Sequence, residues 1–208
     1  MTLPNFEKHL REQLKNHDKP RPFICEGNPL NCKIFIVGIN AATEMQQDFW
    51  SFWSEEAGFN KAKWLESYKA ERAAQPLKKG KTRRNTVSNT RKRIDWIVDA
   101  TKPVKILETN LFVKATPTAK ELKAGDRRSE VFEYLLETIK PEVIFLHGKQ
   151  TIKYFEKLYD IKIVKDKIGC FEILGTKTKV LAKKHLSRGW SEESTKELGK
   201  ELKAGIRN

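Results

Sequence analysis

Two asparagines and two histidines stand where four apolar runs of this sequence end. They are Asn40, Asn110, His147 and His185, and the runs before them have the short, β-branched composition of buried strands. The carboxyl ends of parallel strands lie at one edge of a sheet, which is where open α/β sheets bind ligands. The spacing therefore predicts that these polar side chains converge on one site.

Each residue also has an ordinary structural explanation when it is taken alone. Asn40 follows Gly38 and is typical of a turn, and His185 is typical of a capping or core histidine. His147 has no further match and is expected to be structural. Glu108, inside the second run, is expected to be solvated. Only the combination of several strand ends favours a functional site.

Strands and helices must alternate along the chain to position these residues. Apolar runs predict strands at 34–38, 104–110, 141–148 and 180–182, with a short β excursion at 161–164 and 170–174. Periodic patterns predict helices at 2–15, 61–74, 91–98, 128–139, 149–158 and 192–206. Such alternation indicates a parallel sheet covered on both faces. We predict one domain over residues 1–208, an α/β fold with three α/β/α layers and a central four-stranded, mostly parallel sheet.

Composition limits the class of protein. Hydrophobic residues make up 38% and charged residues 33% of the chain, and no apolar run approaches the ~18 residues that a membrane helix needs. Three cysteines without a CxxC pair argue against a disulfide framework or a metal site built from cysteines alone. We expect a monomeric cytoplasmic protein that does not enter the membrane, with a nucleoid or nuclear location equally open.

The net charge of +14 favours a polyanionic partner, nucleic acid before an anionic membrane surface. The charge is concentrated in a loop over residues 75–93, where no acidic residue interrupts the bases from Lys78 to Arg93. A solvated positive face is the alternative, but the uninterrupted run favours a track for nucleic-acid phosphates. The bases expected to contact DNA are Lys81, Arg83, Arg84 and Arg91.

Three short motifs occur in order on the predicted elements. They read Gly38-Ile39-Asn40-Ala41-Ala42 after the first strand, Thr109-Asn110 at the end of the second, and His185-Leu186-Ser187 after the last. In this order and spacing, the chain resembles the uracil-DNA glycosylase superfamily over roughly residues 34–191. That family has Pro-Gly where Ala41-Ala42 stand here, and proline at the position of Leu186.

The resemblance implies roles for the motif residues. Asn40 would hold the attacking water through its amide oxygen while the sugar becomes cationic. His185 would donate a hydrogen bond to the uracil O2 as negative charge develops there. Asn110 would read the uracil edge, accepting from N3–H and donating to O4. Gly38 and Ile39 would contact the substrate.

The same resemblance assigns further positions. An aromatic residue beyond the water-holding position stacks on the base in that family, which implies Trp53, or Phe52 beside it. Other aromatic residues of the 49–68 segment are expected to be core. Ser187 and the N-terminus of the last helix would bind a backbone phosphate. Trp190, or else Arg188, would fill the gap left by the flipped base.

The implied function is that of a DNA glycosylase, which flips uracil or a related deaminated base and hydrolyses its N-glycosidic bond without a metal or nucleotide cofactor. The alternative is a catalytically weak or inactive module that binds DNA or RNA on the same fold, which the Ala41-Ala42 sequence would explain. A third hypothesis is a small-molecule enzyme. The sequence has neither GxGxxG nor GxxxxGKS/T to support a nucleotide cofactor.

Overall fold

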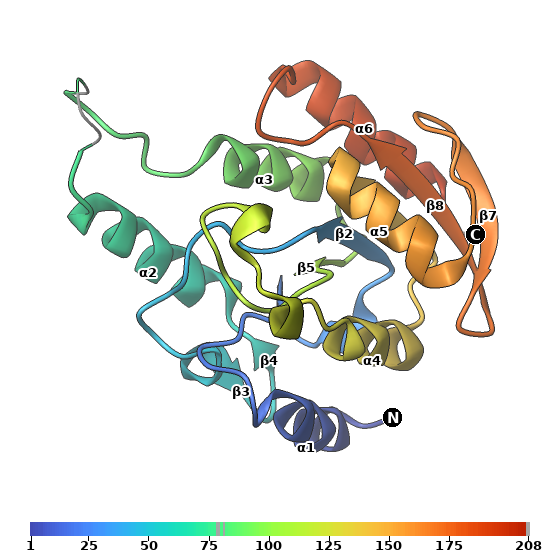
Figure 1. The fold of residues 1–208 in the computed structure, drawn as a ribbon, viewed down its shortest axis with the longest axis horizontal. Coiled ribbons are helices and arrows are strands. Elements are labelled where there is room, and N and C mark those ends of the chain that lie inside the picture. The colour runs from blue at the N-terminus through green and yellow to red at the C-terminus, as the bar shows by residue number, and fades with distance from the viewer. Residues whose placement is uncertain (78–79, 81, 207–208) are drawn as a thin grey trace.

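A six-stranded sheet forms the centre of the molecule within residues 1–77, 80 and 82–206, the part that the computed structural model describes (Figure 1). The strand order is β1-β5-β2-β6-β8-β7, with four parallel strands in the middle and an antiparallel strand at each edge. This confirms the mixed α/β architecture and the mostly parallel central sheet. The strands are β1 (Phe23–Cys25), β2 (Ile34–Gly38), β5 (Ile106–Asn110), β6 (Val143–His147), β7 (Ile168–Ile173) and β8 (Thr176–Lys183).

The central strands are buried on both faces, as their continuous apolar runs predict. Every residue of β2 and of β6 is buried. The register aligns the strand ends, because Gly38 pairs with Asn110 across β2 and β5, and His147 pairs with Lys183 across β6 and β8. The polar residues at and after these ends therefore start from one edge of the sheet.

Over the described residues, the sheet has six strands and not only the four central strands that the sequence predicts, because β1 and β7 add one strand at each edge. The sequence does not predict β1, because a strand of three residues is too short to show a period. Most of the predicted strand segment 170–174 lies in β7, whereas 161–164 is coil. Here the backbone N–H of Ile163 donates to the Glu156 side chain at 2.9 Å and not to a neighbouring strand.

Helices cover both faces of the sheet, which gives the predicted three layers (Figure 1). Alternate residues of β2 point to opposite layers: Ile34 and Ile36 pack under α3 and α6, whereas Phe35 and Val37 face α1, α4 and α5. No helix in the described part of the chain is long and apolar enough to cross a membrane. The helices are α1 (Leu3–Leu14), α2 (Lys61–Ala74), α3 (Asn89–Thr101), α4 (Glu130–Ile139), α5 (Lys149–Tyr159) and α6 (Glu192–Ala204).

Short elements connect the layers. A two-stranded hairpin follows β2 outside the main sheet, and several 3₁₀ turns lie in the loops. The hairpin strands are β3 (Trp53–Ser54) and β4 (Gly58–Phe59). The 3₁₀ turns are η1 (Pro29–Asn31), η2 (Phe49–Phe52), η3 (Ala119–Glu121) and η4 (Ala124–Asp126).

A glycine allows α3 and α6 to pack closely side by side. A Cβ atom at Gly199 would lie 2.7 Å from the Cβ of Ala100 and 2.9 Å from the carbonyl oxygen of Ile97. Any larger residue at 199 would therefore push the two helices apart. The position of α3 matters for function, because α3 also forms part of the site described next.

Candidate functional site

A cavity of about 260 Å³ opens at the carboxyl edge of the central strands. Asn40, Asn110, His147 and His185 all line it. They come from the ends of β2, β5, β6 and β8, or from the residues just after them. Because β2 lies between β5 and β6 in the sheet, side chains that are far apart in sequence become neighbours here. The structure thus brings together the four residues at one edge.

Gly38 leaves room for two of these side chains at the end of β2. A Cβ atom at this position would lie 2.7 Å from Asn110 Oδ1 and 3.4 Å from His147 Nε2. The first distance is shorter than any normal contact, so a side chain here would displace the Asn110 amide. Gly38 and Ile39 both line the cavity, as the resemblance implies for substrate contacts.

The side-chain amide of Asn40 has a fixed orientation. Its Nδ2 donates to the carbonyl oxygens of Ala41 and Thr116, both at 3.1 Å, and to Thr116 Oγ1 at 2.7 Å. Carbonyl oxygens only accept hydrogen bonds, so the nitrogen and not the oxygen must face them. Within the described residues, Oδ1 is therefore left without a donor and can accept a hydrogen bond from a water molecule.

Asn110 offers an unused amide to the cavity. Its side chain makes no hydrogen bond to any of the described residues, although it is only partly exposed and its oxygen lies beside Gly38. A free amide presents an acceptor next to a donor. This arrangement can read a ligand edge that carries a donor beside an acceptor.

His185 is held as a hydrogen-bond donor towards the cavity. The backbone N–H of Ser187 donates to His185 Nδ1 at 3.1 Å, and Ser187 Oγ lies 2.9 Å from the same atom. Because Nδ1 accepts, the proton of the neutral ring is on Nε2. Partial burial lowers the pKa of His185, which favours this neutral form.

His147 is a functional candidate that the sequence marks only by its place at a strand end. Its ring centroid lies 4.8 Å from that of His185, with the planes at 71°. Burial, and then the charge of a protonated His185, lower the pKa of His147 to about 3. Its Nδ1 is buried without a partner among the described residues. Two neutral imidazoles therefore stand together at the cavity.

The stacking role of Trp53, with Phe52 as its alternate, is corrected by the structure. Neither residue lines the cavity. Trp53 Nε1 donates to Glu7 Oε2 at 2.6 Å and its ring stacks on Phe6, while Phe52 is buried in the core. Both belong to the layer that α1 covers, because the short turn η2 directs this aromatic segment away from the strand ends.

The aromatic residues that do line the cavity come from β1 and α2. They are Phe23, Trp64 and Tyr68. Trp64 and Tyr68 stand one turn apart on the helix predicted at 61–74, with ring centroids at 5.4 Å and planes at 19°. The sequence favours core positions for both, and nothing in it marks which core aromatics will border a cavity.

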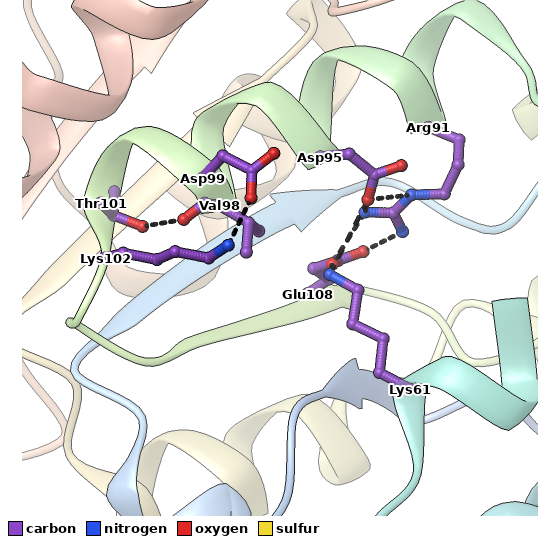
Figure 2. A network of polar contacts seen from close by, with 8 residues as sticks. All are labelled: Lys61, Arg91, Asp95, Val98, Asp99, Thr101, Lys102 and Glu108. Atoms are coloured by element: carbon purple, nitrogen blue, oxygen red, sulfur yellow. Dashed lines mark hydrogen bonds and ion pairs between the residues drawn. The ribbon is translucent and has the colours of Figure 1, made fainter.

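Arg91 and Glu108 form a buried ion pair in the cavity wall, which corrects two expectations. Arg91 donates from Nη1 and Nη2 to the Glu108 carboxylate and from Nε to Asp95, and Lys61 Nζ lies 2.8 Å from Glu108 Oε1 (Figure 2). Arg91 is 5% exposed and Glu108 7% exposed. Arg91 is thus occupied internally and is no DNA-facing base, and Glu108 is not solvated.

The loop after β8 presents one of the two predicted wedge residues. Trp190 packs against the core below α3 and α6, and its Nε1 donates to the His185 carbonyl oxygen at 3.3 Å. Arg188 is exposed in the same loop. The resemblance favours Trp190 as the wedge, but Arg188 is the side chain placed to reach a partner. Ser187 is used to orient His185, and α6 begins with two glutamates that oppose phosphate.

The basic loop is only partly free for contacts with DNA. Arg83 is exposed, whereas Arg84 donates to Gln75 Oε1 and to the carbonyl oxygen of Pro76. Lys81, also expected to contact DNA, lies outside the described residues. Arg83 and Arg188 are therefore the exposed arginines among the sequence-predicted DNA contacts that the structure describes.

Within the described residues, no group of three or more His, Cys, Asp or Glu side chains is arranged to hold a metal ion. Comparison of the sequence with models of protein families, and with curated proteins, gave no match. The assignment of function therefore depends on the geometry of the cavity and on the motifs at its rim.

Proposed function

We propose that this chain is a DNA glycosylase of the uracil-DNA glycosylase type, which hydrolyses the N-glycosidic bond of uracil or a related deaminated base after flipping it out of DNA. One observation carries the proposal: three side chains that line one cavity at the sheet edge each keep an unused hydrogen-bonding group. They are Asn40 Oδ1, the Asn110 amide and His185 Nε2. The three motifs that carry the resemblance lie at the ends of parallel strands of one sheet.

Asn40 serves the attack of water in this proposal. As the bond between C1′ and the base nitrogen breaks, the electron pair leaves with the base and the sugar gains cationic character. The water then needs to be placed more than deprotonated, so an amide oxygen is sufficient. The hydrogen bonds from Nδ2 to Ala41 and Thr116 keep that oxygen in place before the substrate arrives.

His185 serves the departing base. Negative charge spreads onto the O2 of a uracil anion, and the Nε2–H of a neutral imidazole can donate to it as it develops. Ser187 fixes the tautomer that makes this possible, and the lowered pKa of His185 keeps it neutral near pH 7. Proton transfer to the base is not required in the same step.

Asn110 distinguishes the base. Its acceptor oxygen and donor nitrogen match the N3–H and O4 of uracil, whereas cytosine presents the reverse pattern at these two positions. The free amide would then lose hydrogen bonds with the wrong base, and an unsatisfied buried polar group carries a free-energy cost. The exposed Arg83 and Arg188, with the net charge of +14, supply attraction for the DNA backbone.

A nucleic-acid-binding module without catalysis is the second candidate, and one observation favours it. Trp53 is partly buried against the core beside Phe6 and does not line the cavity, so the position that matches the family's base-stacking residue supplies no ring there. The Ala41-Ala42 sequence adds a second departure beside Asn40. On this hypothesis the cavity binds an unpaired base but does not cleave its bond.

Base release from labelled oligonucleotides separates the two candidates. The substrates carry U·A, U·G, hypoxanthine or xanthine, and abasic sites are counted under single-turnover conditions. We expect release by the wild type that falls at least 100-fold in Asn40→Ala and His185→Ala. Asn31→Ala and His9→Ala are matched controls, because both residues are exposed and outside the cavity. Salt-sensitive binding without release supports the module, and no binding at low salt contradicts both candidates.

A further inference from the structure

The arginine side of the cavity carries more positive than negative charge. Arg21, Arg72 and Arg91 line it, and Glu108 is the one carboxylate among the described lining residues. Glu108 is already shared between Arg91 and Lys61. Arg21 and Arg72 are therefore left without an ion pair to any of the described residues.

Arg21 is the clearest case. Its side chain has no hydrogen bond or ion pair with any of the described residues, and it lies only partly exposed at the cavity wall. Burial, and then the charge of Arg91, lower the pKa of Arg21 to about 10, so it remains charged at pH 7. Proteins seldom cover a cation without a partner, because its desolvation is costly.

Trp64 provides a second, independent observation on the same wall. Its side chain is 2% exposed, and its indole Nε1 is buried without an acceptor among the described residues. The Arg91 guanidinium lies 5.6 Å from the Trp64 ring centroid, so the indole also packs against the cationic wall. Trp64 and the unpaired Arg21 line the same cavity, so two cationic or N–H groups without partners in the described part of the chain occur on this wall.

The start of α3 adds further donors. Ser88, the N-cap residue, and Thr90 both line the cavity near the positive end of this 13-residue helix. Arg72 also lines the cavity, and its Nε donates to the Asn85 carbonyl oxygen at 2.9 Å, which leaves its charge unneutralised. Donors and positive charge therefore surround this side of the cavity.

We infer that this wall is a binding subsite for a compact oxyanion, a phosphate group, held by Arg21 on the wall that Trp64 also lines. Both residues also border a neighbouring cavity of about 20 Å³, which has room for about one water molecule. The anion therefore belongs in the larger cavity, beside the groups that read the base. The inference needs only this cavity and does not depend on hydrolysis of a glycosidic bond.

Two sources could supply the phosphate group. It is either a backbone phosphate of the DNA strand that carries the flipped nucleotide, or the phosphate of a free mononucleotide. The chemistry that recognises the group is the same in both cases: a guanidinium faces negatively charged oxygens.

The first test measures binding of inorganic phosphate by calorimetry at constant ionic strength. We expect Arg21→Gln to weaken binding ~10- to 100-fold, because a hydrogen bond to a charged group is lost. Arg128→Gln, which changes an exposed arginine outside the cavity, should bind as the wild type does. Without phosphate, Arg21→Gln should melt at the same temperature as the wild type or higher, because it removes an unpaired charge. Equal binding by both proteins, or a lower melting temperature of Arg21→Gln without phosphate, would overturn the inference.

The second test follows the indole N–H signals by NMR during the phosphate titration. Trp64→Phe identifies the Trp64 signal and removes the donor while keeping an aromatic ring. We expect this signal to shift with phosphate in the wild type and to remain still in Arg21→Gln. An unresponsive Trp64 signal in the wild type overturns the inference.

Comparison of three ligands identifies the source of the phosphate. Binding of dUMP that exceeds binding of deoxyuridine, with the difference lost in Arg21→Gln, supports a free nucleotide. Arg21-dependent binding of a uracil oligonucleotide alone supports a backbone phosphate. If Arg21→Gln changes neither the binding of dUMP nor that of the oligonucleotide, the subsite does not exist. Base release with unchanged phosphate binding would leave the proposed function standing, and the reverse result would leave only the subsite.

Discussion

The two walls of the cavity use their polar groups in opposite ways. At the strand ends, Asn40 Nδ2 and His185 Nδ1 form hydrogen bonds that orient the two side chains. Asn40 Oδ1 and His185 Nε2 are left free of partners among the described residues. In the wall under α3, Arg91 and Glu108 use their charged groups on each other and on their neighbours (Figure 2). The strand-end residues keep groups free for a ligand, whereas the Arg91–Glu108 pair stabilises the fold.

This difference gives a practical distinction between functional and structural polar residues. A buried charge with complete partners contributes to a defined fold, and removing one partner leaves the other exposed to a large desolvation penalty. A neutral group with an unused donor or acceptor at a cavity costs little until a ligand satisfies it. Mutations in the two walls should therefore affect different measurements.

The largest effect is expected for Glu108→Gln. Burial alone would raise the pKa of this carboxyl group, but the charges of Arg91 and Lys61 lower it to about 2, so it is ionised at pH 7. Its neutralisation leaves Arg91 and Lys61 with only the partly exposed Asp95 as a counter-charge, and should reduce the free energy of unfolding by about 3–5 kcal/mol in urea titrations. Asp95→Asn is the control, since Asp95 is more exposed and should cost less than about 1 kcal/mol. Equal losses of stability in Glu108→Gln and Asp95→Asn would show that Glu108 is not the main partner of the buried cations.

The next largest effect is expected on catalysis alone. His185→Gln removes the oriented donor and should reduce the single-turnover rate of base release ~10²- to 10³-fold. Its free energy of unfolding should change by no more than about 0.5 kcal/mol, because the side chain is exposed at the cavity mouth. If His185→Gln lowers the free energy of unfolding but keeps the wild-type rate of base release, His185 is a structural and not a functional residue.

A smaller effect should appear in the pH dependence of stability. His147 stays neutral in the folded protein down to pH about 3, whereas in the unfolded chain it takes up a proton near pH 6.5. Stability should thus fall as the pH falls from about 6.5 towards 3, by at most about 1.4 kcal/mol per pH unit. His147→Gln should flatten this slope between pH 6.5 and 4.5 in urea titrations, while the exposed His9→Gln should not. If the wild type and His147→Gln show the same pH dependence of the free energy of unfolding, His147 is not buried in its neutral form.

The smallest effect is expected for Trp53→Phe. The substitution removes the hydrogen bond to Glu7 and should lower the free energy of unfolding by about 1 kcal/mol. Base release should remain as in the wild type, because Trp53 does not line the cavity. A tenfold slower release would show that this residue does reach the base.

The sequence predicts most of the architecture because its signals are local. Apolar runs that end in a glycine or a polar residue identify the central strands, and periodic patterns identify the helices. The edge strand β1 escapes prediction because it is short, and it exists only because β5 offers it a partner. The strand-end residues of the site are found for the same local reason, since parallel strands align their ends.

The remaining site residues depend on contacts that the sequence does not encode locally. Arg91 and Glu108 are 17 residues apart and meet only when α3 packs over β5, so neither can be recognised as a pair in advance. Arg21 stands in a segment without a period or motif, and only the cavity gives it significance. Trp53 shows the converse, because its place in a motif pattern does not determine which way the chain turns.

Helix α3 connects both walls mechanically. It carries Arg91 in one wall, and its Arg93 donates to the Leu186 carbonyl oxygen at 2.7 Å and to that of Trp190 at 3.1 Å, which fixes the two ends of the His185 loop. A tilt of α3 would therefore move the Arg91–Glu108 wall and the His185 imidazole together, so the packing of this one helix sets the positions of both. The packing of α3 depends in turn on its close contact with α6 at Gly199, outside the cavity. Even one added methyl group there would displace α3 and, with it, both walls of the cavity.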